Sequence, residues 1–123
     1  MNKEPRALLL KGRGKTTIMS SFLKNENVLY IDLKTLFGTK YGLRKLDGVT
    51  MCVILDSSTK EIQKYAPKIK TILEGENILV AARKGQVEAY GSRARFIFVD
   101  EVDDIEILDK GLQRRIFTFK LSF

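Results

Sequence analysis

The sequence contains no histidine and no tryptophan, and it has a single cysteine and two prolines. The absence of histidine excludes imidazole metal sites, histidine general bases and every Ser-His or Cys-His nucleophile. The lone Cys52 lies in the apolar run MCVIL and is predicted to be a buried thiol outside any disulfide framework. No apolar run approaches the roughly 18 residues of a membrane span. The N-terminal MNKEPR lacks the apolar segment of a signal peptide, so we expect a cytoplasmic protein with no membrane partner.

The composition describes one globular domain with an excess of positive charge. Hydrophobic residues make up 44% of the 123 positions and charged residues 30%, which is typical of a folded chain with its own core. We therefore expect a single domain over residues 1–123. Lysine and arginine number 22 against 15 aspartates and glutamates, a net charge of +7. This excess favours polyanionic partners such as nucleic acid or nucleotide phosphates, and a surface that only confers solubility is the alternative.

Strand-like and helix-like segments alternate along the chain. The run VTMCVILD is apolar almost throughout, which is typical of a strand buried on both faces of a parallel sheet. The apolar runs predict strands over residues 6–11, 27–33, 49–56, 77–82, 86–90, 95–100 and 117–123. The runs 77–82 and 86–90 form a predicted hairpin with Arg83, Lys84 and Gly85 at its tip. The alternation predicts an α/β sandwich with a mostly parallel central sheet and a β-hairpin insertion.

Helical spacing predicts helices over residues 16–23, 58–75 and 108–116, while 34–46 fits a loop or a short helix. Ser57 or Ser58 is the expected cap of the second helix, and Gly75 its end. Pro67 is expected to kink or split this helix, because proline lacks the backbone N–H that an interior position requires.

The segment KGRGKTT, residues 11–17, joins the first predicted strand to the first predicted helix. A phosphate-binding loop needs glycines that let backbone N–H groups curl around an anion, a lysine, a hydroxyl for Mg²⁺ and the positive end of a helix. These features are supplied by Gly12, Gly14, Lys15 and Thr16. The full pattern has four residues between its glycines, whereas only Arg13 separates these two. The sequence predicts a shortened phosphate loop, with a basic helix N-terminus as the alternative.

A second candidate element is Asp56, which ends the apolar run VILD. In phosphate-loop proteins an acid at the end of a neighbouring strand holds Mg²⁺, so Thr16 and Asp56 are the candidate metal ligands. The next residue is usually the glutamate that polarises the attacking water in helicase-like ATPases, and here it is Ser57. A cap for the following helix is the alternative role of Asp56.

The third candidate element is the pair Arg114 and Arg115 in DKGLQRRI. Adjacent residues on a helix point about 100° apart, so one can lie on the surface while the other reaches the phosphate of a neighbouring subunit as an arginine finger. A solvated basic helix end, favoured by the helix dipole, is the alternative.

With these elements in line, the chain resembles the catalytic core of a superfamily-three helicase, the hexameric type found in small viruses and plasmids. The segment FGTKYGLRKLDGVTMCVILD looks like the approach to that family's Walker B strand. KIKTILEGENILVAARKGQ is similar to the family's helix and basic β-hairpin, and RFIFVDEVDDIEILDKGLQRRIFTF to its sensor strand and following Gly-Leu-x-Arg-Arg segment. The resemblance covers most of the chain and implies a P-loop NTPase-like fold of the AAA-like class.

The resemblance also implies roles for individual residues. Lys15 and Thr16 would contact the phosphates and Mg²⁺ of ATP, and Asp56 would be the Walker B acid. The hairpin tip, Arg83 and Lys84, would contact single-stranded DNA. Asp100 falls where the family has a sensor asparagine, and Arg114 or Arg115 falls at the arginine finger.

Three departures from the family pattern indicate a degenerate ATPase. The phosphate loop is short, Ser57 replaces the catalytic glutamate, and Asp100 replaces the sensor asparagine with a negative charge near the γ-phosphate. We therefore expect weak or absent ATP hydrolysis, with ATP and Mg²⁺ binding retained or lost. The family's N-terminal oligomerisation and origin-binding parts are not found in this sequence.

The sequence thus predicts a helicase-like domain acting in DNA replication of a small virus or plasmid, in the host cytoplasm if viral. It would bind single-stranded DNA, a replication partner or other copies of itself. The candidate DNA-binding residues are Arg83, Lys84, Arg93 and Arg95.

Two other functions remain open, an active minimal oligomeric ATPase and a non-catalytic interaction module with no ligand. A second resemblance, of KGRGKTT followed by NVLYIDL to the partition-type ATPases, stops near Leu33.

Overall fold

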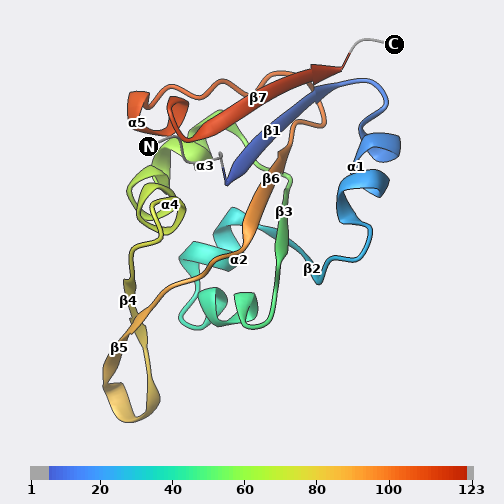
Figure 1. Ribbon diagram of the computed structural model, residues 1–123. Helices are drawn as coiled ribbons and strands as arrows, with labels where there is room; N and C mark the ends of the chain where they lie inside the picture. The colour runs from blue at the N-terminus through green and yellow to red at the C-terminus, as the bar shows by residue number, and fades with distance from the viewer. Residues whose placement is uncertain (1–5, 122–123) are drawn as a thin grey trace.

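A five-stranded sheet forms the centre of the molecule in the computed structural model, which describes residues 6–121, and Arg83 by its backbone alone (Figure 1). The strand order is β2-β3-β6-β1-β7, and every neighbouring pair is parallel. The strands of this sheet are β1 (Ala7–Gly12), β2 (Val28–Asp32), β3 (Met51–Leu55), β6 (Arg95–Val99) and β7 (Ile116–Leu121). An antiparallel hairpin is inserted between β3 and β6, formed by β4 (Ile78–Ala81) and β5 (Val87–Tyr90). The predicted α/β sandwich with a parallel sheet and a hairpin insertion is confirmed.

Short helices connect the strands. They are α1 (Lys15–Leu23), α2 (Leu33–Gly38), α3 (Thr59–Lys64), α4 (Ala66–Leu73) and α5 (Lys110–Gln113), with 3-10 turns at Gly42–Leu46 and Arg83–Gly85. The predicted helix over 58–75 is split at Tyr65, and Pro67 lies in the first turn of α4, where its missing N–H is tolerated. Ser58 caps α3 by accepting a hydrogen bond from the Glu61 N–H at 3.1 Å. No helix within residues 6–121 is long and apolar enough to cross a membrane.

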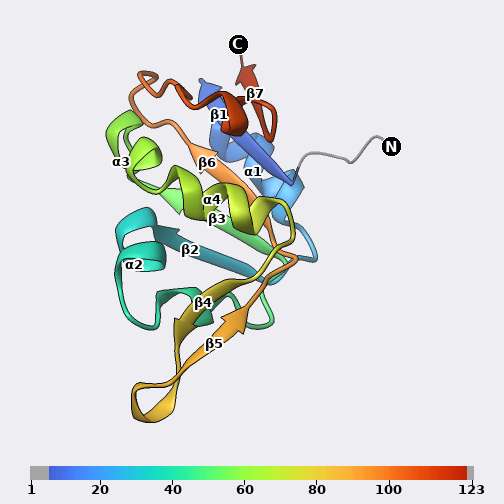
Figure 2. The ribbon, with the colours of Figure 1, turned by 90° about the vertical axis from the view of Figure 1, so that its left-hand side faces the viewer.

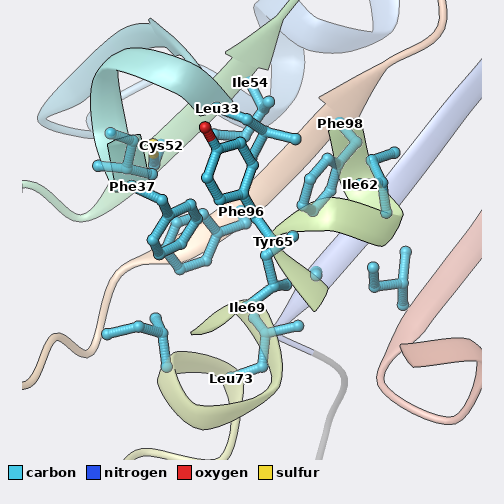
Figure 3. Close-up of a cluster of buried hydrophobic side chains, with 14 of the residues drawn as sticks. Leu33, Phe37, Cys52, Ile54, Ile62, Tyr65, Ile69, Leu73, Phe96 and Phe98 are labelled. Carbon is cyan, nitrogen blue, oxygen red and sulfur yellow. The ribbon is translucent and has the colours of Figure 1, made fainter. Parts of the chain in front are cut away.

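The sheet is covered on both faces, which accounts for the nearly continuous apolar run of β3. The larger core lies between the sheet and the helices α2 to α5, and Figure 3 shows Ile54, Phe96 and Phe98 meeting Tyr65 there. The smaller core lies under α1 on the other face. It is formed by Leu10, Met51, Val53, Ile97 and Val99, with Met19 and Leu23 of α1 packed against it.

The two ends of the parallel strands define two distinct edges of the molecule. The carboxyl ends of β1, β3 and β6 lead into the glycine turn, Asp56 and Asp100. The hairpin joins α4 to the start of β6, so it belongs to the amino edge, and it projects away from the sheet (Figure 2). The predicted strand at 117–123 is observed as β7 up to Leu121, while residues 122–123, like 1–5, lie outside the described range.

Candidate functional site

The glycine turn lies between β1 and α1, as the sequence predicts. Gly12 and Gly14 have φ angles of +92° and +85°, a left-handed conformation that favours glycine. A Cβ atom on Gly12 would lie 2.1 Å from the carbonyl oxygen of Leu121 in β7, so the neighbouring strand also requires a glycine here. The sharp turn brings the N-terminus of α1 directly to the carboxyl edge of the sheet.

Lys15 closes this turn on itself. Its Nζ donates a hydrogen bond to the Gly12 carbonyl at 2.7 Å. Gly14 occupies the N-cap position and offers no side-chain acceptor, so the exposed first turn of α1 keeps amide N–H groups for water or an anion. Thr16 is exposed in the same turn. The turn thus has backbone N–H donors at its surface, while the Lys15 ammonium is already bonded to the Gly12 carbonyl.

Asp56 and Asp100 lie at the same edge as the glycine turn. In the parallel register Leu10 of β1 pairs with Val99 of β6, and Ile54 of β3 pairs with Phe98. Asp100 directly follows β6, which lies between β1 and β3, so it lies between the carboxyl ends of these two strands. Asp56 is exposed and has a φ angle of +53°, an uncommon conformation outside glycine. Ser58, not Asp56, caps the following helix, which leaves the Asp56 carboxylate available.

Asp100, in contrast, is fully buried and both of its carboxylate oxygens have partners. Oδ1 accepts from the Asp104 N–H at 3.1 Å, and Oδ2 accepts from the Ile105 N–H at 2.8 Å. The Lys11 ammonium lies 3.4 Å from Oδ2. Burial alone would raise the pKa of Asp100, but the two N–H groups and Lys11 outweigh it and lower the pKa below its ordinary value. Asp100 therefore anchors the turn 101–105 to the sheet, a role that its place in the sequence pattern did not suggest.

Within the described residues no group of three or more cysteine or acidic side chains could hold a metal ion. Mg²⁺ at nucleotide sites is commonly held by one or two carboxylates together with phosphate oxygens, so a metal held by Asp56 and Thr16 together with a phosphate stays a prediction. Ser57, in the position of the usual glutamate, has a buried hydroxyl with no hydrogen-bond partner within residues 6–121.

The predicted DNA-binding residues lie at the amino edge, away from the glycine turn. Lys84 is exposed at the hairpin tip with a φ angle of +55°, next to the backbone of Arg83. Arg93 and Arg95 are exposed where the chain returns from the hairpin into β6. The structure thus places Lys84 on the projecting hairpin, whereas Arg93 lies in the segment after the hairpin and Arg95 begins β6 of the central sheet.

Two polar contacts seat the hairpin against the 3-10 turn at Gly42–Leu46. The Tyr90 hydroxyl donates to Asp47 Oδ1 at 2.6 Å, and Arg44 pairs with Glu88. Partial burial, followed by the bond to Asp47, raises the pKa of Tyr90.

The two candidate finger arginines have different surroundings. Arg115 donates to the Gly111 carbonyl at 2.7 Å and pairs with Glu74, so it connects α5 to α4. Arg114 is exposed and forms no ion pair within residues 6–121. Both arginines directly precede β7 and therefore lie at the amino edge, whereas the glycine turn lies at the carboxyl edge. An arginine finger at either position would therefore act on the glycine turn of another copy.

No protein-family model matches this sequence, and no curated protein matches it. Matching solved structures include the crystal structure of JCV helicase, from JC virus, bound to N-(4-(2-(thiazolo[5,4-c]pyridin-2-yl)phenoxy)phenyl)acetamide. The TM-score is 0.59 at 15% sequence identity, and the match covers 94% of this chain and 36% of that chain. The fold is therefore that of a helicase-like P-loop domain, and this chain spans about a third of the length of the helicase chain. Membership of superfamily three stays a prediction, since this identity shows the fold alone.

Proposed function

We propose that this chain is a helicase-like P-loop domain of a small virus or plasmid that acts in DNA replication by binding nucleic acid or a replication partner, with weak or absent ATP hydrolysis. The observation that carries the proposal is the strand–glycine turn–helix unit of residues 7–23 in a helicase-like parallel sheet, with a cationic hairpin at the opposite edge. The two edges would serve two ligands, a phosphate at the turn and a nucleic acid at the hairpin.

Weak hydrolysis is supported by three features of the glycine turn and its surroundings. The turn has a single residue between its glycines, and Lys15 is bonded to Gly12. Ser57 supplies no base beside Asp56. Asp100 uses both oxygens inside the fold, so it has no free group for a γ-phosphate or an attacking water.

Nucleic-acid binding is supported by the exposed cations of the amino edge. Lysine and arginine contacts to phosphates release counterions, so binding should weaken steeply as salt rises. We expect the triple variant Lys84→Ala, Arg93→Ala and Arg95→Ala to lose most of its affinity for single-stranded DNA and to show a smaller salt slope. Filter binding at low and moderate salt measures this, with the exposed Lys60→Ala of α3 as the control. No binding by the unmodified chain at either salt would remove the DNA part of the proposal.

Phosphate binding at the turn is tested by melting temperature. A ligand that binds only the folded state stabilises it by about 2.7 kcal/mol at a hundred times its Kd. ATP, ADP and inorganic phosphate, each with and without Mg²⁺, are added to the chain and to Lys15→Ala, with Lys24→Ala at the other end of α1 as the matched control. We expect a rise in melting temperature that Lys15→Ala abolishes and Lys24→Ala keeps, and ATP turnover near background in all three proteins.

The hydrogen bond from Lys15 to Gly12 favours a second candidate, a non-catalytic interaction module with no ligand at the turn. This candidate takes first place if ATP, ADP and phosphate all leave the melting temperature unchanged. Turnover that Lys15→Ala abolishes would instead favour an active minimal ATPase.

A further inference from the structure

Among residues 6–121, no strand pairs with the outer edge of β7. Within the described residues it pairs only with β1, and Figure 1 shows it at the rim of the sheet. Its six residues are regular and contain no proline, and its single charge is Lys120. Phe117 and Phe119 are 54% and 42% exposed. Exposed edge strands of soluble proteins are usually shortened, bulged or charged because they pair with other strands, so this edge fits a partner strand.

A groove runs beside β7, and Ile116, Phe117 and Thr118 of this strand line it. It has a volume of about 560 Å³ and is lined by residues of β1, β7 and the segment 105–108. Its polar groups come from Glu106, Gln113 and Lys11. The side chains of an added strand alternate between the two faces, so every second one would enter this groove.

We propose that a second copy of this chain pairs with β7 in an antiparallel arrangement, continuing the sheet across a twofold axis. The segment Phe117-Thr118-Phe119 reads the same in both directions, so pairing centred on Thr118 is self-complementary. In this pairing Phe117 of each copy lies opposite Phe119 of the other, so two aromatic pairs form on the exposed face. Thr118 lies opposite its own copy on the groove face. Aromatic pairs and threonine pairs are among the favourable cross-strand contacts.

Charge complementarity supports this register. Lys120 comes to lie opposite Ile116 of the second copy, and therefore over the groove that Ile116 and Glu106 line. Neither Lys120 nor Glu106 forms an ion pair within residues 6–121, so each is available to the other copy. Because of the twofold axis the Lys120–Glu106 contact forms twice. The two Lys120 residues are four positions apart along the pairing, roughly 13 Å, so their repulsion is largely screened.

The first test measures the oligomeric state of the full chain over a concentration series by sedimentation equilibrium. A dimer is expected. Thr118→Lys places two positive charges opposite each other at the centre of the pairing and should raise the dimer dissociation constant at least about tenfold. Ser21→Lys, on the exposed surface of α1, adds the same charge away from β7 and should leave the constant unchanged. Melting temperatures check that both variants fold.

The second test uses charge reversal and needs no change at Thr118. Lys120→Glu and Glu106→Lys should each weaken the dimer, because each places like charges opposite one another twice. Mixing the two variants should give a heterodimer, since both contacts then join opposite charges. Association of the double variant Lys120→Glu, Glu106→Lys should recover towards that of the unmodified chain.

Three outcomes would overturn the inference. They are a monomer at every concentration, an assembly that Thr118→Lys leaves intact, and two charge-reversed variants that do not associate on mixing. The inference does not depend on the proposed function, because no residue of the glycine turn or the hairpin takes part in it.

Discussion

Replacing Asp100 by asparagine distinguishes two roles of this residue, a structural anchor for the turn 101–105 and a sensor of bound nucleotide. If Asp100 anchors the turn 101–105, as its contacts indicate, losing the carboxylate destabilises the fold. If it acts as the sensor that the family resemblance implies, asparagine restores the family residue and improves nucleotide binding at little cost in stability.

The magnitude follows from the contacts. Asp100→Ala removes the acceptor for two backbone N–H groups, one of them buried, and leaves Lys11 without its partner. An unsatisfied buried donor costs about 1–3 kcal/mol, and breaking a buried ion pair costs about 3–5 kcal/mol. These costs overlap, and Lys11 keeps partial access to water, so we expect a loss of about 3–4 kcal/mol in the free energy of unfolding. Asparagine keeps one acceptor and the side-chain shape, so Asp100→Asn should lose about 1–3 kcal/mol.

Urea unfolding followed by circular dichroism measures both variants against the unmodified chain. The pH dependence supplies an independent check. Because the pKa of Asp100 is lowered in the folded protein, its stabilisation is present above the ordinary aspartate pKa of about 3.9 and is lost as the pH falls below it. The difference between the chain and Asp100→Asn should therefore be largest at neutral pH and shrink on acidification. Lys11→Met in a double-mutant cycle isolates the ion pair.

Equal stability of Asp100→Asn and the unmodified chain at neutral pH, together with tighter ATP binding, would refute the anchoring role and favour the sensor.

Three further predictions concern the rest of the fold. Gly12→Ala should lower the free energy of unfolding in urea by roughly 2–4 kcal/mol, because the added Cβ would lie 2.1 Å from the Leu121 carbonyl oxygen. Gly48 has a similar positive φ but nothing within 4 Å of an added Cβ, so Gly48→Ala should lower it by only about 1 kcal/mol. Equal losses in the two variants would contradict the close approach of β7 to Gly12. Ser58→Ala should lower the free energy of unfolding by about 1 kcal/mol through loss of the α3 cap, and an unchanged midpoint would count against the cap. Burial raises the pKa of the Cys52 thiol to about 12, so a thiol reagent should react slowly with the native chain and fast in urea, and rapid native labelling would show that the core opens readily.

Local sequence patterns were sufficient to predict those secondary-structure elements that depend on residues close together in the chain. The apolar run of β3, the Ser58 cap and the hairpin tip at Lys84 and Gly85 all follow from side-chain burial, capping and turn chemistry within a few residues. The break at Tyr65 was expected from Pro67 alone. These features depend on neighbours in the sequence, so a single sequence contains their causes.

The candidate site depends on neighbours in space, which local patterns cannot supply. The insertion of β6 between β1 and β3 places Asp100 beside Lys11, and it converts a candidate ligand contact into a buried anchor. Packing of α5 on α4 gives Arg115 a partner in Glu74, while Arg114 stays exposed. The residue types and their spacing thus determined which functional groups this protein has at its candidate site, including a glycine turn with a lysine. Which of those groups remain free was decided by the strand order and by contacts between residues dozens of positions apart, since burial and pairing are properties of the packed chain.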